Sequence, residues 1–242
     1  MLEIFEKEEQ VAEAIADAMA AGLKEEAHPL FCLASGSTPQ KSYQRFAVQA
    51  KDTDDIKKLR IVSLDEWVGI EKHSTGSCYQ MLQRDLFSPA GIQSHQILFY
   101  DGMSPDLQQE CEKIDAYIEQ HPITFSLMGV GMNGHIGLNE PGTPVRDHSS
   151  VVDLSNETKT TAQKYFDEPA ALSEGITLGL KQVIHSKKVI VAITGGHKAD
   201  IVKEIFNHSE AKLPAQELLH HDHIDFYLDT EAAKYITQKV EG

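Results

Sequence analysis

The 242-residue chain has little of several features that mark whole classes of protein. Its only cysteines are Cys32, Cys78 and Cys111, widely spaced and without a CxxC pair, so three reduced thiols in a cytoplasmic protein are the simplest interpretation. It has no apolar run long enough to span a bilayer. Its acidic start, residues 1–9, lacks the basic-then-apolar pattern of a signal peptide. The sequence therefore predicts neither membrane insertion nor export.

Positive charge is also scarce. The chain has 22 Lys and Arg against 37 Asp and Glu, which gives a formal net charge of −15. This balance argues against nucleic acid or an acidic membrane surface as a partner, because phosphate backbones attract basic patches. It does not exclude a small anionic ligand, since a few local donors can outweigh the overall field.

No internal repeat, low-complexity tract or Pro-, Gly- or Ser-rich linker divides the sequence. With 41% hydrophobic and 24% charged residues, the composition is ordinary for a soluble globular protein. The length suits one α/β domain, which we expect to cover residues 1–242.

Helical and strand-like segments alternate along this domain. Val11, Ile15, Met19 and Leu23 recur at helical spacing and predict a first helix over residues 8–25. Short apolar runs predict strands at residues 30–33, 60–64, 97–100, 124–128, 189–193 and 224–228. Further helices are predicted at the C-terminus and at residues 39–48, 77–87, 105–120, 158–165, 176–185 and 197–206. Such alternation predicts a mostly parallel sheet with helices on both faces, and ligands bind such sheets beyond the carboxyl ends of the strands.

The segment Gly129–Gly142, which follows the fourth predicted strand, brings several reactive groups into one glycine-rich loop. His135 can transfer protons near neutral pH, Glu140 could orient and charge-stabilise it, and Asn133 adds a neutral amide. A GxGxxG pattern here matches the dinucleotide fingerprint, but glycines and prolines downstream prevent the helix that this fingerprint requires. We interpret the loop as the rim of an active site. A tight turn holding a structural histidine is the alternative.

After the first predicted strand come Ser35, Gly36, Ser37, Thr38 and Pro39. A Ser or Thr N-cap with proline at the first helical position is typical of a helix start. Backbone amides, hydroxyls and the helix dipole together form an anion site. We interpret this loop as a phosphate cradle, and capping without a ligand is the alternative. The GxxxxGK[ST] pattern of a Walker A loop is missing.

Charged groups follow two other strands. Asp65 comes after the second strand, and Trp67, the only tryptophan, could shield it from water. A carboxylate in a partly apolar site can have its pKa raised toward general-base use. Lys198 follows the fifth strand and is well placed to bind a phosphate. A solvated turn and a surface lysine are the competing interpretations. Together, the four strand ends predict a site for proton transfer on a small phosphorylated substrate.

One conspicuous cluster stays outside this site. Residues 220–223 read His-His-Asp-His, without the separated or i,i+4 spacing of zinc ligands. We interpret them as a polar loop and expect no metal site.

Three segments resemble the glucosamine-6-phosphate deaminase/isomerase family: Leu33–Pro39, Ser63–Gly69 and Gly129–Pro141. Ile176–Leu180 and Gly195–Lys198 add to the likeness. The matching segments occur in order across nearly the whole chain. Within the family, the sequence looks most like the galactosamine-6-phosphate isomerases, through Asp-Glu-Trp-Val and the later Thr-Gly-Ser-Cys.

The resemblance implies a Rossmann-like α/β fold and a reaction that uses neither metal nor cofactor. A 2-amino-2-deoxyhexose 6-phosphate would be isomerised and hydrolytically deaminated to a ketohexose 6-phosphate plus ammonia. By position, Asp65 is the base that moves a proton between C2 and C1. His135 assists ring opening with Glu140 as its partner. The loop Ser35–Thr38 and Lys198 would hold the phosphate.

Two positions depart from the family pattern. Some members carry Asp where this chain has Asn133, so the His135–Glu140 pair would have to suffice and the pH profile could differ. Where some members have a phosphate-binding Arg, the best match here is Lys164, which supplies charge without the bidentate fork.

Two other functions compete. A 6-phosphogluconolactonase resembles this family in fold and in its histidine loop, but its pattern lacks the Asn139–Pro141 segment, so Glu140 is the discriminating residue. A non-catalytic sugar-phosphate sensor would not need Asp65, His135 and Glu140. The preferred epimer at C4 stays open, and we expect a monomer or dimer rather than a larger homo-oligomer.

Overall fold

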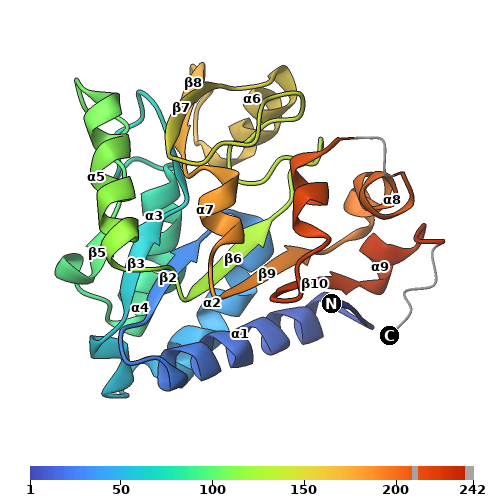
Figure 1. Cartoon of the computed structure of the whole chain (residues 1–242), viewed down its shortest axis with the longest axis horizontal. Coiled ribbons are helices and arrows are strands. Elements are labelled where there is room, and N and C mark those ends of the chain that lie inside the picture. The colour runs from blue at the N-terminus through green and yellow to red at the C-terminus, as the bar shows by residue number, and fades with distance from the viewer. Residues whose placement is uncertain (209–211, 238–242) are drawn as a thin grey trace.

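The computed structural model describes residues 1–208 and 212–237 (Figure 1). Its centre is a seven-stranded sheet in the order β1-β10-β9-β6-β2-β3-β5, and every neighbouring pair is parallel. The strands are β1 (Leu2–Phe5), β2 (Leu30–Leu33), β3 (Arg60–Ser63), β5 (Ile97–Leu98), β6 (Phe125–Gly129), β9 (Lys188–Ile193) and β10 (Ile224–Asp229). This confirms the predicted parallel sheet. The short β1 at its edge was not predicted.

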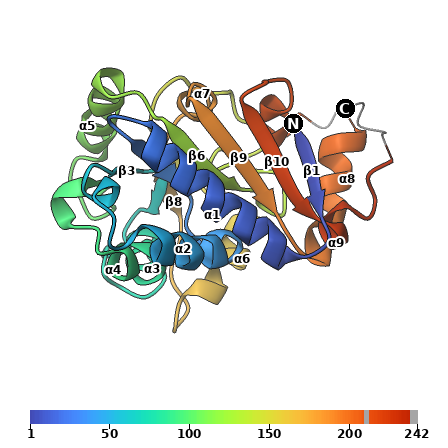
Figure 2. The same ribbon diagram turned by 90° about the horizontal axis from the view of Figure 1, so that it is seen from below.

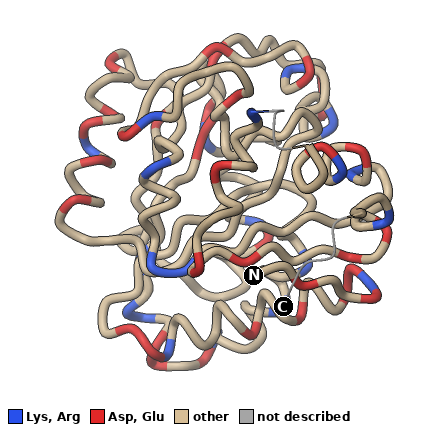
Figure 3. Tube along the Cα trace, turned by 45° about the vertical axis from the view of Figure 1, so that its right-hand side comes forward, with Lys and Arg blue, Asp and Glu red and all other residues tan. Residues whose placement is uncertain are grey.

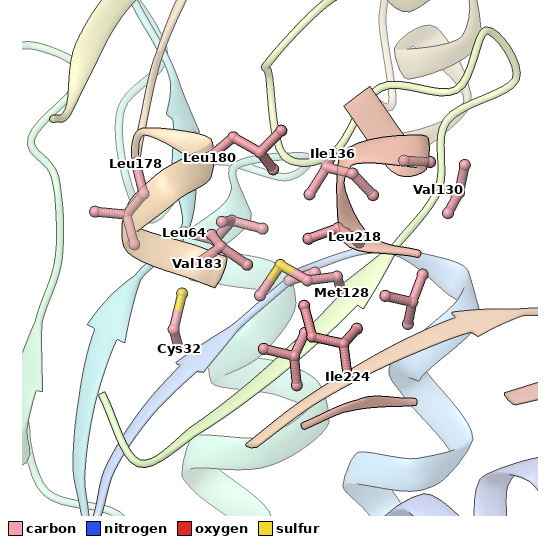
Figure 4. Close-up of a cluster of buried hydrophobic side chains, with 14 of the residues drawn as sticks. Cys32, Leu64, Met128, Val130, Ile136, Leu178, Leu180, Val183, Leu218 and Ile224 are labelled. Atoms are coloured by element: carbon pink, nitrogen blue, oxygen red, sulfur yellow. The ribbon is translucent and has the colours of Figure 1, made fainter. Parts of the chain in front are cut away.

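Helices cover both faces of the sheet because successive strand residues point to opposite sides. In β2, Phe31 packs into one core, and Leu30 and Cys32 pack into the other. The first core holds the helices α1 (Glu8–Glu25), α2 (Ser37–Ala50), α3 (Cys78–Leu82) and α4 (Ser88–Ala90), which lie together in Figure 2. The second holds α5 (Leu107–Gln120), α7 (Leu180–Ile184), α8 (Ala199–Asn207) and α9 (Thr230–Ala233). Figure 4 shows part of this second core, with Cys32, Met128 and Val183 in one cluster.

A second, antiparallel sheet of three strands stands beside the first, in the order β4-β8-β7. It comprises β4 (Asp65–Trp67), β7 (Ser150–Asp153) and β8 (Glu174–Thr177), and α6 (Asn156–Ala162) follows β7. The predicted helix over residues 176–185 is wrong in its first part. Residues 174–177 pair with strands on both sides, so tertiary pairing overrides the local helical pattern, and α7 begins only after Gly179.

Other predicted boundaries shift by a few residues. α2 begins at Ser37 with Gly36 as its N-cap, at a φ of 106° and without a side-chain cap, so Pro39 is the third helical residue and not the first. The predicted helix at 77–87 is α3 followed by a π-helical turn over Gln83–Phe87. The helix at 158–165 is α6 followed by a 3₁₀ turn at Gln163–Tyr165. The predicted C-terminal helix is the short α9, and residues 209–211 and 238–242 of the predicted domain lie outside the described residues.

The strand order fixes where a ligand can bind. From β2 the chain adds β3 and β5 on one side and then returns to place β6 on the other side. The topological switch point therefore lies between the carboxyl ends of β2 and β6, where open α/β sheets bind their ligands. The ends of β3 and β9 flank this crevice.

Acidic residues outnumber basic ones in the fold, as they do in the sequence. Asp and Glu outnumber Lys and Arg along the trace in Figure 3. Among residues 1–208 and 212–237, no helix is both long and apolar enough to cross a membrane.

Candidate active site

A pocket opens at the carboxyl ends of β2, β3, β6 and β9. It is lined by the loop after β2 (34–39), Asp65, the loop after β6 (129–132), His135 and the pair His197 and Lys198. The far wall is formed by Trp67 of β4, by Leu138 of the loop after β6, and by α6 with the 3₁₀ turn that follows it, through Thr158, Thr161, Lys164 and Tyr165. Every residue that the sequence assigned to the site lines this pocket, except Asn133 and Glu140, which lie behind His135.

Glu140, expected from the sequence to orient and charge-stabilise His135, is linked to it by hydrogen bonds through Asn133 and Thr158. Nδ1 of His135 lies 2.7 Å from Oδ1 of Asn133, and Nδ2 of Asn133 donates to Oε2 of Glu140 at 2.7 Å. The direct distance from Nδ1 to Oε2 is 3.7 Å. Thr158 provides a second link, because its hydroxyl lies 3.3 Å from Nδ1 and donates to Oε1 of Glu140 at 2.5 Å. The imidazole packs on Gly131, where a Cβ would meet it at 2.1 Å.

This chain of contacts fixes the proton on the imidazole. The ionised carboxylate of Glu140 only accepts hydrogen bonds, so the NH₂ of Asn133 must face it. The carbonyl of Asn133 then faces His135, whose Nδ1 must carry the proton. Nε2 is left with a lone pair, so the histidine side chain can accept a proton at that atom.

Burial and polar contacts set the charges of this pair. Burial lowers the pKa of His135, Glu140 raises it, and Lys198 lowers it again, so the imidazole is neutral at pH 7. For Glu140, burial would raise the pKa, but the hydrogen bond from Thr158, the nearby His135 and the hydrogen bond from Asn133 outweigh it. The pKa of Glu140 is therefore lowered and the group stays ionised.

Asp65 has the opposite shift. Burial raises its pKa from 3.8 to about 7, and a hydrogen bond from the Cys78 thiol opposes this rise. Trp67, only 6% exposed, lines the same pocket, and its indole N–H donates to the carbonyl of Gly76 at 3.1 Å. At neutral pH Asp65 is thus close to half ionised, the condition in which a carboxyl group serves best as a general base.

The other end of the pocket is positively charged. Burial and the neighbouring Lys164 lower the pKa of Lys198 to about 8. Its Nζ donates to the carbonyl of Val130 at 2.6 Å, which aims the ammonium into the pocket. Gly36 at the start of α2 faces the hydroxyl of Tyr165, which would lie 3.0 Å from a Cβ added at Gly36. Backbone amides at the start of α2 and two lysines can together bind an anion.

Several pocket residues carried no assignment from the sequence, among them Thr158, Tyr165, Glu157 and His197. Thr158 touches both His135 and Glu140, and Tyr165 faces the glycine of the predicted phosphate cradle. Glu157 and His197 also line the pocket. The first three reach the site only because α6 folds over it, and no local pattern signals that approach. His197 precedes Lys198 directly, so its position at a strand end was the one available signal.

The described residues hold no group of three or more His, Cys, Asp or Glu side chains arranged for a metal ion. In the polar segment 220–223, Nε2 of His223 lies 2.7 Å from the carbonyl of Ile184 in α7. This contact gives the last histidine of that segment a role in packing.

Comparisons with known proteins place the chain in a family. A family model described as glucosamine-6-phosphate isomerases/6-phosphogluconolactonase matches residues 6–227. A glucosamine-6-phosphate deaminase of Halalkalibacterium halodurans is 29% identical over 208 residues, which is 84% of this chain and 85% of the relative. One from Bacillus thuringiensis is 29% identical over 235 residues, covering 96% and 87%.

Solved structures show the same fold. A monomeric glucosamine-6-phosphate deaminase superimposes with a TM-score of 0.91 at 25% identity and covers 97% of this chain and 99% of its own. The 6-phosphogluconolactonase of Thermotoga maritima gives 0.74 at 21% identity, covering 95% and 98%, a likeness of fold alone. Since the family model matches nearly the whole chain, the protein belongs to the glucosamine-6-phosphate isomerase/6-phosphogluconolactonase family, as its motifs predicted.

Proposed function

We propose that this protein is an amino-sugar-phosphate deaminase/isomerase. It converts glucosamine 6-phosphate or galactosamine 6-phosphate, with water, to a ketohexose 6-phosphate and ammonia. One observation carries the proposal: a carboxyl group with its pKa raised to about 7 shares a pocket with a neutral imidazole and a half-buried lysine. An aldose–ketose shift needs one base for carbon and one acid/base for oxygen.

His135 serves the oxygen chemistry. Nδ1 holds its proton on Asn133, so Nε2 is the reactive atom. It takes the proton from the anomeric hydroxyl and delivers it to the ring oxygen, which opens the ring to the aldehyde. The imidazole ends this step neutral, and the hydrogen bonds to Asn133 and Thr158 keep the ring in one orientation throughout.

Asp65 serves the carbon chemistry. Its carboxylate removes the proton from C2 while the aldehyde oxygen O1 takes a proton from the substrate's own ammonium group, which gives an enolamine. The carboxyl group of Asp65 then returns its proton to C1, which gives an iminium ion at C2. Water then adds to C2 and ammonia leaves, so the products are a ketohexose 6-phosphate and one ammonia. No electrons are lost or gained overall, and the reaction therefore requires no nicotinamide.

The positive end of the pocket accounts for a phosphorylated substrate. We assign the loop Ser35–Thr38, Lys198 and Lys164 to the phosphate. A ligand spanning from there to Asp65 would place its reacting carbons beside the carboxylate. The protein would act in the cytoplasm, in keeping with its three unpaired cysteines. The monomeric structural neighbour supports a monomer.

Curated relatives named glucosamine-6-phosphate deaminase support this chemistry over lactone hydrolysis. The test is turnover of three substrates by the purified protein. Ammonia release from glucosamine 6-phosphate or galactosamine 6-phosphate is expected, and the ratio of the two kcat/KM values identifies the preferred epimer. Hydrolysis of 6-phosphogluconolactone without ammonia release would reassign the protein as a lactonase. Binding of sugar phosphates without turnover of any would indicate a sensor.

A further inference from the structure

Thr158, the third residue of α6, touches two groups that the proposed chemistry needs. It is 4% exposed and belongs to the far wall of the pocket, whereas His135 and Glu140 belong to the loop after β6. Its hydroxyl oxygen lies 3.3 Å from Nδ1 of His135 and 2.5 Å from Oε1 of Glu140. One side chain of α6 therefore contacts both members of the proposed acid/base pair.

The first residues of α6 hold the carboxylate of Glu140. Ser155 is the N-cap of this helix, and its Oγ accepts the N–H of Thr158 at 3.1 Å. The N–H of Ser155 donates to Oε1 of Glu140 at 3.2 Å, so Oε1 accepts this N–H as well as the hydroxyl of Thr158. Oε2 accepts the amide of Asn133. Two of the three donors to the carboxylate thus come from the start of α6.

The direction of each bond to Thr158 follows from its single hydroxyl hydrogen. This hydrogen can go to only one acceptor, and the ionised carboxylate of Glu140 at 2.5 Å is the strongest one in reach. The oxygen of Thr158 is then left to accept. It receives the hydroxyl of Ser155 at 3.0 Å and, at 3.3 Å, the hydrogen on Nδ1 of His135, which is shared with Asn133. This set of bonds is consistent with a proton on Nδ1.

A second arrangement would use the same atoms with the opposite outcome. The two ends of the amide of Asn133 have nearly the same shape, so this side chain can turn over by half a turn. Its NH₂ would then face Nδ1 of His135, and the reactive lone pair would move from Nε2 to Nδ1. Its carbonyl would face Glu140, which a carboxylate repels. The group that holds Glu140 ionised and in place therefore also decides which nitrogen of His135 reacts.

We propose that Thr158 is a positioning residue for ring opening, which keeps Nε2 of His135 free by donating to Glu140 from the start of α6. While this bond holds the carboxylate, Asn133 stays turned with its carbonyl toward the imidazole. Although burial raises the pKa of Glu140, its contacts lower it overall, and the bond from Thr158 contributes most among them. The inference rests on the proposed function, in which Nε2 moves the proton. It adds that α6 completes the acid/base pair.

Two substitutions and one control test this role by kinetics. Thr158→Val removes the hydroxyl but keeps the branched shape and the backbone bond to Ser155, whereas Thr158→Ser keeps the hydroxyl. In Thr158→Val, kcat for the amino-sugar phosphate should fall about tenfold and KM should change less than about twofold, and Thr158→Ser should restore most of kcat. Thr160→Val, on the exposed side of α6, should leave both constants unchanged. An unchanged kcat in Thr158→Val, or an equal loss in the Val and Ser variants, would overturn the proposal.

A second measurement identifies the tautomer without turnover. In protein labelled with ¹⁵N-histidine, NMR correlation of the ring nitrogens with the ring C–H protons shows which nitrogen carries the hydrogen, and His135→Gln identifies the signals of His135. At neutral pH the wild type and Thr158→Ser should show Nδ1–H, and Thr158→Val should show a mixture of both tautomers. Nδ1–H alone in Thr158→Val would contradict the proposal. If the wild type releases no ammonia but the tautomer responds as expected, the proposed function fails and the positioning role of Thr158 stands.

Discussion

The amide nitrogen of Asn133 donates to Oε2 of Glu140 at 2.7 Å, which makes a neutral side chain the link between that carboxylate and His135. A carboxylate in place of Asn133 could exchange a proton with the imidazole. The amide of Asn133 cannot do so and only keeps the imidazole ring in its orientation. In this protein Asn133 sets the tautomer of His135. The negative charge beside the ring comes from Glu140, whose Oε2 lies 3.7 Å from Nδ1 of His135. The reactive lone pair on Nε2 follows from that arrangement.

Replacement of Asn133 tests this link. Asn133→Ala should lower kcat by roughly 10- to 100-fold with KM changed much less, because the imidazole loses its orientation and not its contact with substrate. Asn133→Asp should instead raise the pKa of His135 and shift the pH profile of kcat upward, since it adds a second negative charge beside the ring. Steady-state kinetics across pH check both results. Equal profiles for Asn133→Asp and the wild type would argue against the tautomer assignment.

Lys198 gives a prediction at alkaline pH. Its pKa, lowered to about 8 by burial and by Lys164, means that the free protein loses this positive charge as the pH rises through 8. The KM for the sugar phosphate should therefore rise above about pH 8, and Lys198→Ala should raise it at least tenfold at pH 7 and abolish that pH dependence. Lys203→Ala, on the exposed side of α8, is the matched control. A wild-type KM that stays flat from pH 7 to 9.5 would count against Lys198 as a phosphate ligand.

Glu66 gives a prediction about stability. Its two oxygens accept three backbone N–H groups, so in Glu66→Gln the new NH₂ must face a donor. The substitution should lower the free energy of unfolding by about 1–3 kcal/mol. Urea denaturation measures the effect, with the exposed Glu13→Gln in α1 as control. No loss in Glu66→Gln would mean that the start of α3 does not depend on this carboxylate.

Asp65 should weaken the fold at the pH where it works. Its pKa is about 7 in the folded protein against 3.8 ordinarily, so the unfolded chain releases the proton first as the pH rises. Ionisation of Asp65 therefore lowers the free energy of unfolding. This decrease is zero below about pH 4, grows between pH 4 and 7 and reaches up to about 4 kcal/mol at pH 8. Asp65→Asn should thus be more stable than the wild type at pH 8 and equal to it at pH 4. Denaturation curves at the two pH values decide, and a variant no more stable at pH 8 contradicts the raised pKa.

Much of the site could be predicted because parallel strands bring their carboxyl ends to one edge. Asp65, His135 and Lys198 are far apart in sequence, yet each follows a strand, and strand adjacency alone brings them together. The glycine and hydroxyls of Ser35–Thr38 correctly indicated a loop at the pocket, and its role as a phosphate cradle stays a prediction. The helix start was misplaced by two residues because the backbone at Gly36, and not a side chain, forms the cap.

The second sheet could not be predicted in the same way. The last two residues of β8, Ile176 and Thr177, were assigned to a helix because the pairing partners of β8, β4 and β7, lie elsewhere in the sequence. The wall of the pocket formed by α6 and the turn after it, with Thr158 and Tyr165, was missed because no local pattern signals that α6 folds over the site. The buried carboxylate of Glu66 at the start of α3 was also not predicted, because no periodicity reveals its three backbone partners.

The most direct test of the account is ammonia release by Asp65→Asn beside the wild type, with calorimetric binding of the preferred amino-sugar phosphate to both. The wild type should release ammonia and ketohexose 6-phosphate in equal amounts. The variant should bind the substrate with a Kd within about threefold of the wild type and turn over at least about a thousandfold more slowly, because it keeps the pocket and loses the base. A variant that retains turnover, or that loses binding and turnover equally, would show that Asp65 is not the base.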